Sequence, residues 1–302
     1  MLPFSRVAII GMGLIGSSLS RAVRAKLPTV HLSVHDADPE VRVRVRDLDL
    51  ADDVADTAGA AVIDADLVIL AVPVLAMMKV AASIADDLPA GCVVSDTGSV
   101  KASVLADLTE VLPEGMAIVP AHPVAGTENS GPDAGFATLF EGRWCILTPP
   151  AGADELAVER VREFWARLGA KVEVMDPAHH DMVLAVTSHL PHLIAYSIVG
   201  TASDLEGVTR SEVIKYSAGG FRDFTRIASS DPVMWRDVFL SNKDAVLDVL
   251  QRFSEDLTAL QRAIRWGDGD FLEALFTRTR AVRRGIVDEG QDTGDADFGR
   301  KH

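Results

Sequence analysis

The sequence predicts an α/β fold, in which an N-terminal doubly wound parallel sheet is followed by an all-helical domain. Three observations predict it: short apolar runs alternate with amphipathic segments, a glycine-rich turn follows the first run, and only helical patterns follow Asp176 and Pro177. Apolar runs that alternate with helices are typical of buried parallel strands. We therefore expect one domain over residues 1–175, an all-helical domain over 176–287, and a disordered polar tail over 288–302.

The bulk composition limits the classes of partner. The chain has 302 residues, of which 48% are hydrophobic and 24% charged, and its formal net charge is -15. A surface this acidic repels phosphate, so we expect neither nucleic acid nor an anionic membrane as a partner. We also expect no signal peptide, no membrane-spanning segment and a cytoplasmic location. In that reducing compartment Cys92 and Cys145 are expected to be small buried hydrophobic residues, not a disulfide or a zinc site.

Strand-length apolar runs divide the first domain, and we interpret them as buried parallel strands in βαβ units. These runs are RVAIIG (6–11), VHLSVHD (30–36), ADLVILAVP (65–73), GCVVSDTG (91–98), MAIVPAHP (116–123), RWCILTPP (143–150) and AKVEVMD (170–176). The segment VRVRVR (41–46) alternates as a half-buried strand would. However, Asp38 and Pro39 have the character of a helix cap and first turn, and Val41, Val45 and Leu48 share one helical face, so we predict a helix.

The remaining predicted elements are helices. One runs from Asp154 to Leu168 and is closed by Gly169. In the second domain, Ser230 or Asp231 is expected to cap a helix that Pro232 starts. A long apolar face follows, and another helix is expected from Phe271 to Val287. The members of that apolar face are Val246, Val249, Leu250, Phe253, Leu257, Leu260 and Ile264. Broad apolar faces of this length favour packing against a second copy of the chain, with packing inside the domain as the alternative.

The turn after the first run carries a cofactor signal. Gly11, Gly13 and Gly16 have the spacing G-x-G-x-x-G between a strand and a helix, which is typical of a Rossmann-type dinucleotide site. Gly11 allows the tight turn, Gly13 the approach of a pyrophosphate, and Gly16 close packing of helix and strand. The amide groups of Leu14 and Ile15 at the helix start are then expected to hold the phosphates.

Asp36 ends the second predicted strand, 20 residues after Gly16. A carboxylate there accepts hydrogen bonds from a ribose hydroxyl and repels a 2'-phosphate, so we expect NAD in preference to NADP. Val72, Pro73 and Thr97 end later strands and are assigned to the same ligand crevice.

Several motifs together resemble one family. GMGLIGSSL (11–19), SDTGSVK (95–101), PAHPVAG (120–126), HLPH (189–192) and GGFRDFTRIASSDPVMWRDVFLSNK (219–243) are similar to motifs of the prephenate and arogenate dehydrogenases of tyrosine biosynthesis. The resemblance implies NAD-dependent oxidative decarboxylation of prephenate, of arogenate, or of both. It also implies a homodimer formed through the helical domain, and it leaves room for tyrosine to compete at the active site.

His122 is the residue that the resemblance assigns as the catalytic base, and a neutral imidazole suits removal of a hydroxyl proton near pH 7. Its setting on a proline-bounded strand end agrees with that role, and a buried structural histidine is the alternative. Ser99 resembles the family serine that hydrogen-bonds the same hydroxyl. Its alternative is the N-cap of the helix that follows, and the two roles are compatible.

The resemblance places carboxylate binding at Arg226, whose guanidinium matches a carboxylate in two parallel hydrogen bonds. It also assigns His192 to substrate contact. We add Arg222, Ser230 and Trp235 to the candidate substrate site. Solvent exposure is the alternative for Arg222, and a place in the core is the alternative for Trp235.

Histidines 179, 180, 189 and 192 raise the question of a metal, but Pro191 interrupts the spacing and hydride transfer needs none, so we expect no metal. Two other functions stay open. A β-hydroxyacid dehydrogenase or imine reductase would share the two-domain plan, although we find no matching catalytic lysine motif. A non-catalytic NAD-binding sensor would have lost the base or the carboxylate-binding arginine, yet His122 and Arg226 are both present.

Overall fold

The computed structural model describes residues 2–127, 129–204 and 219–288. The chain forms two compact units, Met1–Val246 and Leu247–His302. The boundary predicted near residue 175 falls inside the first unit and stays a prediction. Apart from Asp288, the predicted tail lies outside the described residues.

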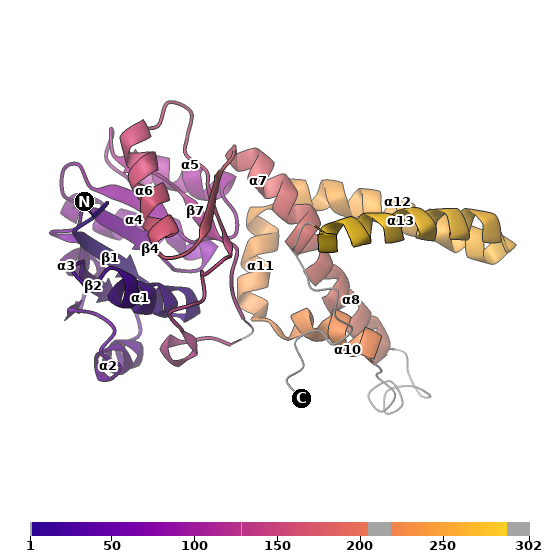
Figure 1. The fold of residues 1–302 in the computed structure, drawn as a ribbon, viewed down its shortest axis with the longest axis horizontal. Coiled ribbons are helices and arrows are strands. Elements are labelled where there is room, and N and C mark those ends of the chain that lie inside the picture. The colour runs from indigo at the N-terminus through magenta and orange to yellow at the C-terminus, as the bar shows by residue number, and fades with distance from the viewer. Residues whose placement is uncertain (1, 128, 205–218, 289–302) are drawn as a thin grey trace. The chain divides into compact units, whose positions relative to one another are not determined.

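The first unit contains a parallel sheet with the strand order β3-β2-β1-β4-β5-β6, which confirms the predicted doubly wound sheet. Its strands are β1 (Arg6–Ile10), β2 (His31–His35), β3 (Asp53–Val54), β4 (Leu67–Leu70), β5 (Val93–Asp96) and β6 (Ala117–Ile118). Figure 1 labels its strands β1, β2 and β4. The order reverses between β1 and β4, and such a switch point opens a ligand crevice at the carboxyl ends of the strands.

Both faces of this sheet are buried because successive side chains of a strand point to opposite sides. Val7 and Ile9 of β1 belong to one hydrophobic cluster, whereas Ala8 and Ile10 belong to the other. Continuous burial on both faces is the reason for the unbroken apolar runs in the sequence.

Helices connect and cover the strands. They are α1 (Leu14–Lys26), α2 (Pro39–Asp47), α3 (Ala58–Val62), α4 (Met77–Ile84), α5 (Ala102–Val111) and α6 (Glu155–Arg167). The VRVRVR segment is helical, as predicted. The Asp38 side chain accepts a hydrogen bond from the Glu40 amide, Pro39 lies in the first turn, and Val45 is buried. Local capping chemistry therefore outweighs the strand-like alternation.

The predicted run 116–123 divides into two strands, so one expectation was wrong. After β6 the chain leaves the first sheet at Pro120, and a proline has no N–H to continue a ladder. A second sheet follows, in the order β7 (Ala121–Pro123), β8 (Trp144–Leu147) and β9 (Lys171–Val174). β7 and β8 are antiparallel, with His122 opposite Ile146, so these runs do not extend the parallel sheet.

Among the described residues after Asp176, only helical elements occur, as predicted. In the first unit these are α7 (Pro177–Leu184), the π-helical turn η4 (Ala185–His189), α8 (Leu190–Asp204), α10 (Gly219–Thr225), the 3-10 turn η5 (Arg226–Ser229) and α11 (Pro232–Ser241). α12 (Lys243–Trp266) and α13 (Gly269–Asp288) follow and make up the described part of the second unit from Leu247.

The continuous helix Pro177–Asp204 bears on the expectation that no segment spans a membrane. It is long and apolar enough to cross a bilayer by length and composition alone, and 28% of its most apolar window is buried. The same test is passed by core helices of soluble proteins. His180, Asp181 and His189 are buried on this helix and bonded to other elements of the first unit, so its buried surface is protein core.

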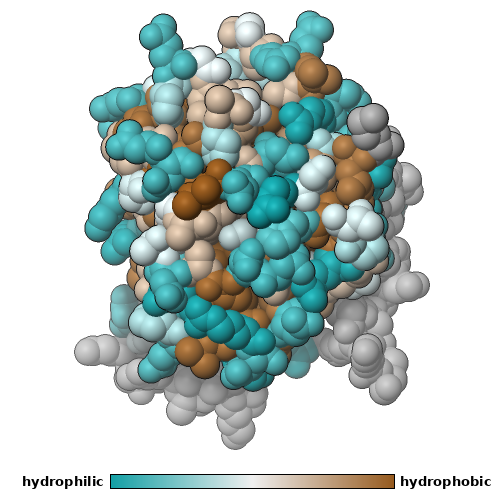
Figure 2. Space-filling view, turned by 90° about the vertical axis from the view of Figure 1, so that its left-hand side faces the viewer, coloured by the Kyte–Doolittle hydropathy of each residue, from teal (hydrophilic) through white to brown (hydrophobic). Residues whose placement is uncertain are grey.

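The second unit has little core of its own. In residues 247–285, the part whose side chains are described, Ala263 alone is buried. Leu257 and Ile264 of α12 are 48% and 68% exposed, although they belong to the predicted apolar face. By contrast, the face of the molecule in Figure 2 is mostly hydrophilic, with hydrophobic patches between polar side chains.

Candidate active site

The glycine turn between β1 and α1 has the shape of a nucleotide cradle. Gly11 has a positive φ of 99°, and a Cβ there would lie 2.4 Å from the Ala71 carbonyl oxygen. A Cβ at Gly16 would lie 1.9 Å from the Gly11 oxygen, whereas one at Gly13 would meet nothing within 4 Å. Gly11 and Gly16 are therefore required by packing, while Gly13 borders open space at the start of α1. That space and the uncapped helix start fit a pyrophosphate.

Asp36 lies at the carboxyl end of β2, beside this turn. Its carboxylate accepts hydrogen bonds from the Met12 amide at 2.8 Å and the Asp38 amide at 2.9 Å. A carboxylate has about four acceptor positions, so a ribose hydroxyl can still bind. Arg42, which sequence reasoning missed, donates to the carbonyl oxygens of Asp36 and Ala37.

His122 lies in β7 and is 7% exposed. Its Nδ1 atom is 2.8 Å from Nε2 of His180. Burial, together with the nearby His180, Lys101 and His189, holds the pKa of His122 well below its usual 6.5. The imidazole is therefore neutral near pH 7, which is the form that accepts a proton.

A buried ion pair clamps the backbone next to His122. Lys101 and Asp96, both fully buried, bond to each other. The Lys101 ammonium donates to the Ala121 carbonyl oxygen at 2.7 Å, and the Asp96 carboxylate accepts from the Ala121 amide at 3.2 Å. Both peptide groups of Ala121 are thus held by the end of β5 and the start of α5, which orients the residue that follows.

The other side of His122 is a hydrogen-bonded chain that sequence reasoning missed. His180 Nδ1 is 2.9 Å from Asp181 Oδ1. The Asp181 carboxylate also accepts the amides of Lys101 and Ala102 at 2.8 and 2.9 Å. His122 and His180 are 58 residues apart, and no spacing in the sequence pairs them.

Asn242, at the end of α11, completes this chain. Its Nδ2 atom donates to the Asp181 carbonyl oxygen at 2.8 Å and lies 3.1 Å from His189 Nδ1. Burial lowers the pKa of His189 to about 4, so this third histidine is neutral as well. η4, which carries His189, is a π-helical turn, and such turns are frequent at functional sites.

Ser99 is half-buried between β5 and α5. Lys101 is the N-cap residue of α5 and makes no side-chain cap bond, and Asp181 accepts the first amides instead. The alternative of Ser99 as the N-cap was therefore wrong. Thr97 follows β5, and Val72 and Pro73 follow β4, so all these residues lie at the same sheet edge as the glycine turn.

The predicted substrate residues divide into a packed group and an exposed one. His192 stacks on Trp235 with ring centroids 3.6 Å apart, and its Nδ1 donates to the Ser188 carbonyl oxygen at 2.8 Å. Burial lowers the pKa of His192, and the charge of Arg226 lowers it further. Trp235 is 7% exposed and belongs to the core cluster, so its indole forms a packed wall behind His192.

The remaining candidates lie around this group. The Ser230 carbonyl oxygen accepts a hydrogen bond from the Tyr196 hydroxyl at 2.8 Å. Asp231, not Ser230, caps α11 by accepting from the Met234 amide. Arg222 is exposed beside Asp223 at 3.5 Å, so the structure does not bring it into the packed group.

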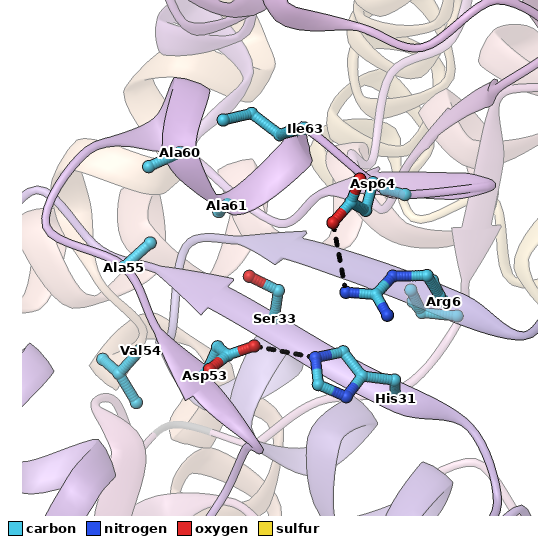
Figure 3. A pocket seen from close by; sticks show the side chains of 12 residues that line it. Arg6, His31, Ser33, Asp53, Val54, Ala55, Ala60, Ala61, Ile63 and Asp64 are labelled. Atoms are coloured by element: carbon cyan, nitrogen blue, oxygen red, sulfur yellow. Dashed lines mark hydrogen bonds and ion pairs between the residues drawn. The ribbon is translucent and has the colours of Figure 1, made fainter.

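A hollow lined by Arg6, His31 and Asp53 opens at the amino ends of β1 and β2, opposite the glycine turn. Its charges pair locally, since Arg6 bonds Asp64 at 3.5 Å and His31 bonds Asp53 at 2.7 Å (Figure 3). Because the candidate catalytic groups lie elsewhere, we do not assign the substrate to it. Among the described residues, no three His, Cys, Asp or Glu side chains form a metal-holding group.

Comparisons with known proteins agree with this arrangement. The family model described as "Prephenate dehydrogenase, nucleotide-binding domain" matches residues 19–174, and the one described as "Prephenate dehydrogenase, dimerization domain" matches residues 176–278. The cyclohexadienyl dehydrogenase of Zymomonas mobilis is 48% identical over 94% of this chain and 96% of its own length. The prephenate dehydrogenase of Bacillus subtilis is 34% identical over 93% of this chain and 76% of its own.

A solved structure extends the similarity to three dimensions. The crystal structure of prephenate dehydrogenase from A. aeolicus, in complex with hydroxyphenyl propionate and NAD+, matches with a TM-score of 0.86 at 34% identity. The match covers 93% of this chain and 98% of that one. With family models matched on both parts and relatives similar over nearly the whole length, the chain belongs to the prephenate dehydrogenase family.

Proposed function

We propose that this protein catalyses the NAD-dependent oxidative decarboxylation of cyclohexadienyl acids, namely prephenate, arogenate, or both. Prephenate would give 4-hydroxyphenylpyruvate and arogenate would give tyrosine. The observation that carries the proposal is His122, a buried neutral imidazole on the strand that follows the nucleotide-binding sheet. The relatives named cyclohexadienyl and prephenate dehydrogenase support the choice of substrate class.

The chemistry asks for a proton acceptor at the ring hydroxyl. As the C4 hydrogen leaves with its electron pair, the hydroxyl O–H bond breaks, a carbonyl forms, and His122 takes the proton. Loss of the ring carboxylate as carbon dioxide returns electrons to that carbonyl oxygen, which recovers the proton as the ring becomes aromatic. NAD, when bound, accepts the hydride. Ser99, at the same sheet edge, is assigned to hydrogen-bond the hydroxyl.

The substrate carries carboxylates that need a cation in a strongly acidic protein. We assign this role to Arg226, whose charge acts on His192, and we assign His192 to contact with the substrate. The stacked Trp235 keeps the His192 ring in place. Ser230 contributes through its backbone, while the exposed Arg222 takes a peripheral part at most.

NAD fits the glycine cradle better than NADP does. Gly13 leaves room for the pyrophosphate, the Leu14 and Ile15 amides lie at the helix start, and Asp36 presents a carboxylate to the ribose. Arg42 moderates this preference because its guanidinium lies against the backbone of Asp36.

We also infer a cytoplasmic homodimer that is open to competition by tyrosine. The family description of residues 176–278 as a dimerization domain and the exposed apolar side chains of α12 support the dimer. Tyrosine resembles the aromatic product, so we expect it to raise the KM for substrate without changing kcat.

The test is a side-by-side measurement of kcat/KM with prephenate and arogenate, each with NAD and NADP, followed by NADH or NADPH absorbance and by product identification. We expect turnover with at least one acid and a preference for NAD. The absence of turnover in all four combinations, with the protein folded and NAD bound, would falsify the proposal.

A further inference from the structure

We infer that His180 and Asp181 set the tautomer of His122, so that its Nε2 atom is the nitrogen available to take the substrate proton. The two residues act as positioning residues because they touch His122 and not the reacting atoms. The inference rests on the proposed function in one respect, namely the part that His122 plays in the reaction.

The hydrogen-bond directions can be followed from Asp181. Its two oxygens accept the Lys101 and Ala102 amides at the start of α5. Backbone amides only donate, and an ionised carboxylate only accepts. His180 Nδ1, 2.9 Å from Asp181 Oδ1, must therefore carry a hydrogen.

The next link follows from the charge of His180. Burial lowers the pKa of His180, and the nearby Lys101 lowers it further, while Asp181 and Asp96 raise it. A neutral ring with hydrogen on Nδ1 has a bare Nε2. This Nε2 accepts from His122 Nδ1 at 2.8 Å, which leaves Nε2 of His122 without a hydrogen.

The hydrogen bonds that run from Asp181 through His180 to His122 form a relay. Three elements hold this relay in place, so its direction does not depend on one flexible side chain. α7 carries His180 and Asp181, the N-terminal end of α5 supplies the two amides, and Asn242, directly after α11, bonds the Asp181 carbonyl oxygen at 2.8 Å. The protonated ring nitrogen of a histidine is set by the bond that the other nitrogen makes. The opposite tautomer would present an N–H to the substrate hydroxyl and remove the base.

The relay also stabilises the protonated form of His122. When His122 Nε2 takes the hydroxyl proton, the resulting imidazolium keeps its Nδ1–H against His180 Nε2, with the Asp181 charge behind. Burial opposes a cation at His122, as do the nearby His180, Lys101 and His189, and the Asp181 charge offsets part of that cost.

Asp181→Asn is the main test because it is isosteric. Oδ1 of Asp181 accepts from both the Lys101 amide and His180 Nδ1, and Oδ2 accepts from the Ala102 amide. An NH2 group in the place of Oδ1 donates to His180 Nδ1 and reverses both tautomers, whereas one in the place of Oδ2 leaves both tautomers unchanged. With the tautomers reversed, we expect kcat to fall by about 10²–10⁴-fold, in line with the wrong-tautomer effect at catalytic histidines. KM for substrate and Kd for NAD should change by less than about threefold. Raising the pH should not restore kcat, because a changed tautomer, unlike a shifted pKa, lowers the plateau.

Asp176→Asn is the matched control. Asp176 caps the same helix by accepting from the Ala178 and His179 amides, and asparagine caps equally well. Its kcat should stay within about twofold of the wild type. Should the Asp181 variant fail to fold or keep the wild-type tautomer, His180→Phe, which removes the acceptor, replaces it, with the exposed neighbour substitution His179→Phe as its control.

A direct readout is independent of turnover. Nitrogen-15 NMR of histidine-labelled protein at pH 7.5, assigned with a His122→Asn variant, should show hydrogen on Nδ1 of His122 in the wild type, and it identifies the tautomer that each variant holds. A wild-type Nε2–H signal, or full kcat in a variant whose His122 carries its hydrogen on Nε2, would overturn the inference. If no cyclohexadienyl acid is turned over, the proposed function fails, yet the NMR result still decides the tautomer.

Discussion

At the residue scale, the surroundings of His122 suit it to act as a base. It is bonded through Nδ1 to His180, its backbone neighbour Ala121 is clamped by Asp96 and Lys101, and burial keeps it neutral. A solvent-exposed histidine would be partly charged near pH 6.5 and free to rotate. The position thus supplies both the protonation state and the orientation that a base requires.

His122→Asn should lower kcat by about 10²–10⁴-fold, because the proton acceptor is lost while the backbone stays. NAD affinity, measured by fluorescence titration, should change by less than about twofold. The exposed neighbour of the relay, His179, offers the control His179→Asn, which should leave kcat unchanged. Near-normal turnover in His122→Asn would remove His122 from its assigned role.

Arg226→Gln should raise the KM for prephenate or arogenate by about 10–10²-fold, since a charge-assisted hydrogen bond to a carboxylate contributes roughly 1.5–3 kcal/mol. The effect on kcat should be smaller. Arg252→Gln, at a position 77% exposed on α12, is the matched control. An unchanged KM in steady-state assays would assign the carboxylate to another cation.

At the element scale, two glycines within six residues at the turn between β1 and α1 have different roles, one in packing and one in cofactor binding. Gly16 is held against the Gly11 carbonyl oxygen, while Gly13 faces open space. Alanine at Gly16 is therefore expected to lower the stability of the fold, whereas alanine at Gly13 is expected to weaken NAD binding.

Gly16→Ala should destabilise the fold by about 1–3 kcal/mol, because its Cβ would overlap sterically with the Gly11 carbonyl oxygen. Gly13→Ala should leave stability within about 0.5 kcal/mol and weaken NAD binding about tenfold or more, since the methyl group occupies the cofactor's approach. Urea unfolding and NAD titration of both variants check this. Equal loss of stability in both, or full NAD affinity in Gly13→Ala, would contradict it.

The α7–η4–α8 segment makes the stability of the fold depend on pH. His180, His189 and His192 all have pKa values lowered by burial, His189 to about 4. In the unfolded chain these histidines regain their ordinary pKa near 6.5, so below that pH the unfolded chain binds more protons than the folded one. The contribution of the three neutral histidines to stability is therefore complete above about pH 6.5 and declines as the pH falls toward 4.

Stability should therefore decline between pH 6.5 and pH 4 by on the order of 1 kcal/mol per pH unit through His189, and His180 and His192 should add to the decline below pH 6.5. Urea midpoints at pH 7.5 and 5.5 measure the decline. His189→Gln removes one titrating group and should make it shallower. An identical pH dependence in the two proteins would exclude His189 as a contributor.

At the scale of the whole molecule, the described part of the second unit leaves most of its apolar side chains exposed. α12 and α13 are long, yet Ala263 is the one buried side chain in its described part, and large apolar residues stay exposed. Exposed apolar faces of this extent are typical of subunit interfaces. The match to a dimerization domain over residues 176–278 agrees with that interpretation.

Leu257→Glu combined with Ile264→Glu should convert a dimer to a monomer in sedimentation experiments, because two charges on one face of α12 cannot be desolvated in an interface. Helical content by circular dichroism should be retained. Leu156→Glu, 67% exposed on α6, is the matched apolar-to-charged control and should stay dimeric. A monomeric wild type at micromolar concentration would contradict the prediction.

The sequence by itself determined the α/β character of the first part, the helical character of the second and the glycine turn. These depend on local rules: buried strands require continuous apolar runs, caps require particular side chains, and a tight turn requires glycine. Even α2 followed from Asp38 and Pro39. The motifs around His122 and Arg226 were also sufficient to place the chain in its family.

The tertiary structure alone decided the relay from His122 through His180 to Asp181, the clamp on Ala121 and the departure of β7 from the parallel sheet. Each depends on groups that are distant in the chain, and hydrogen bonds between such groups leave no periodic pattern in a sequence. Capping of α5 by Asp181, a residue 80 positions from Lys101, is of the same kind. Local propensity selects the elements, whereas the direction of a buried hydrogen bond is set only when the elements meet.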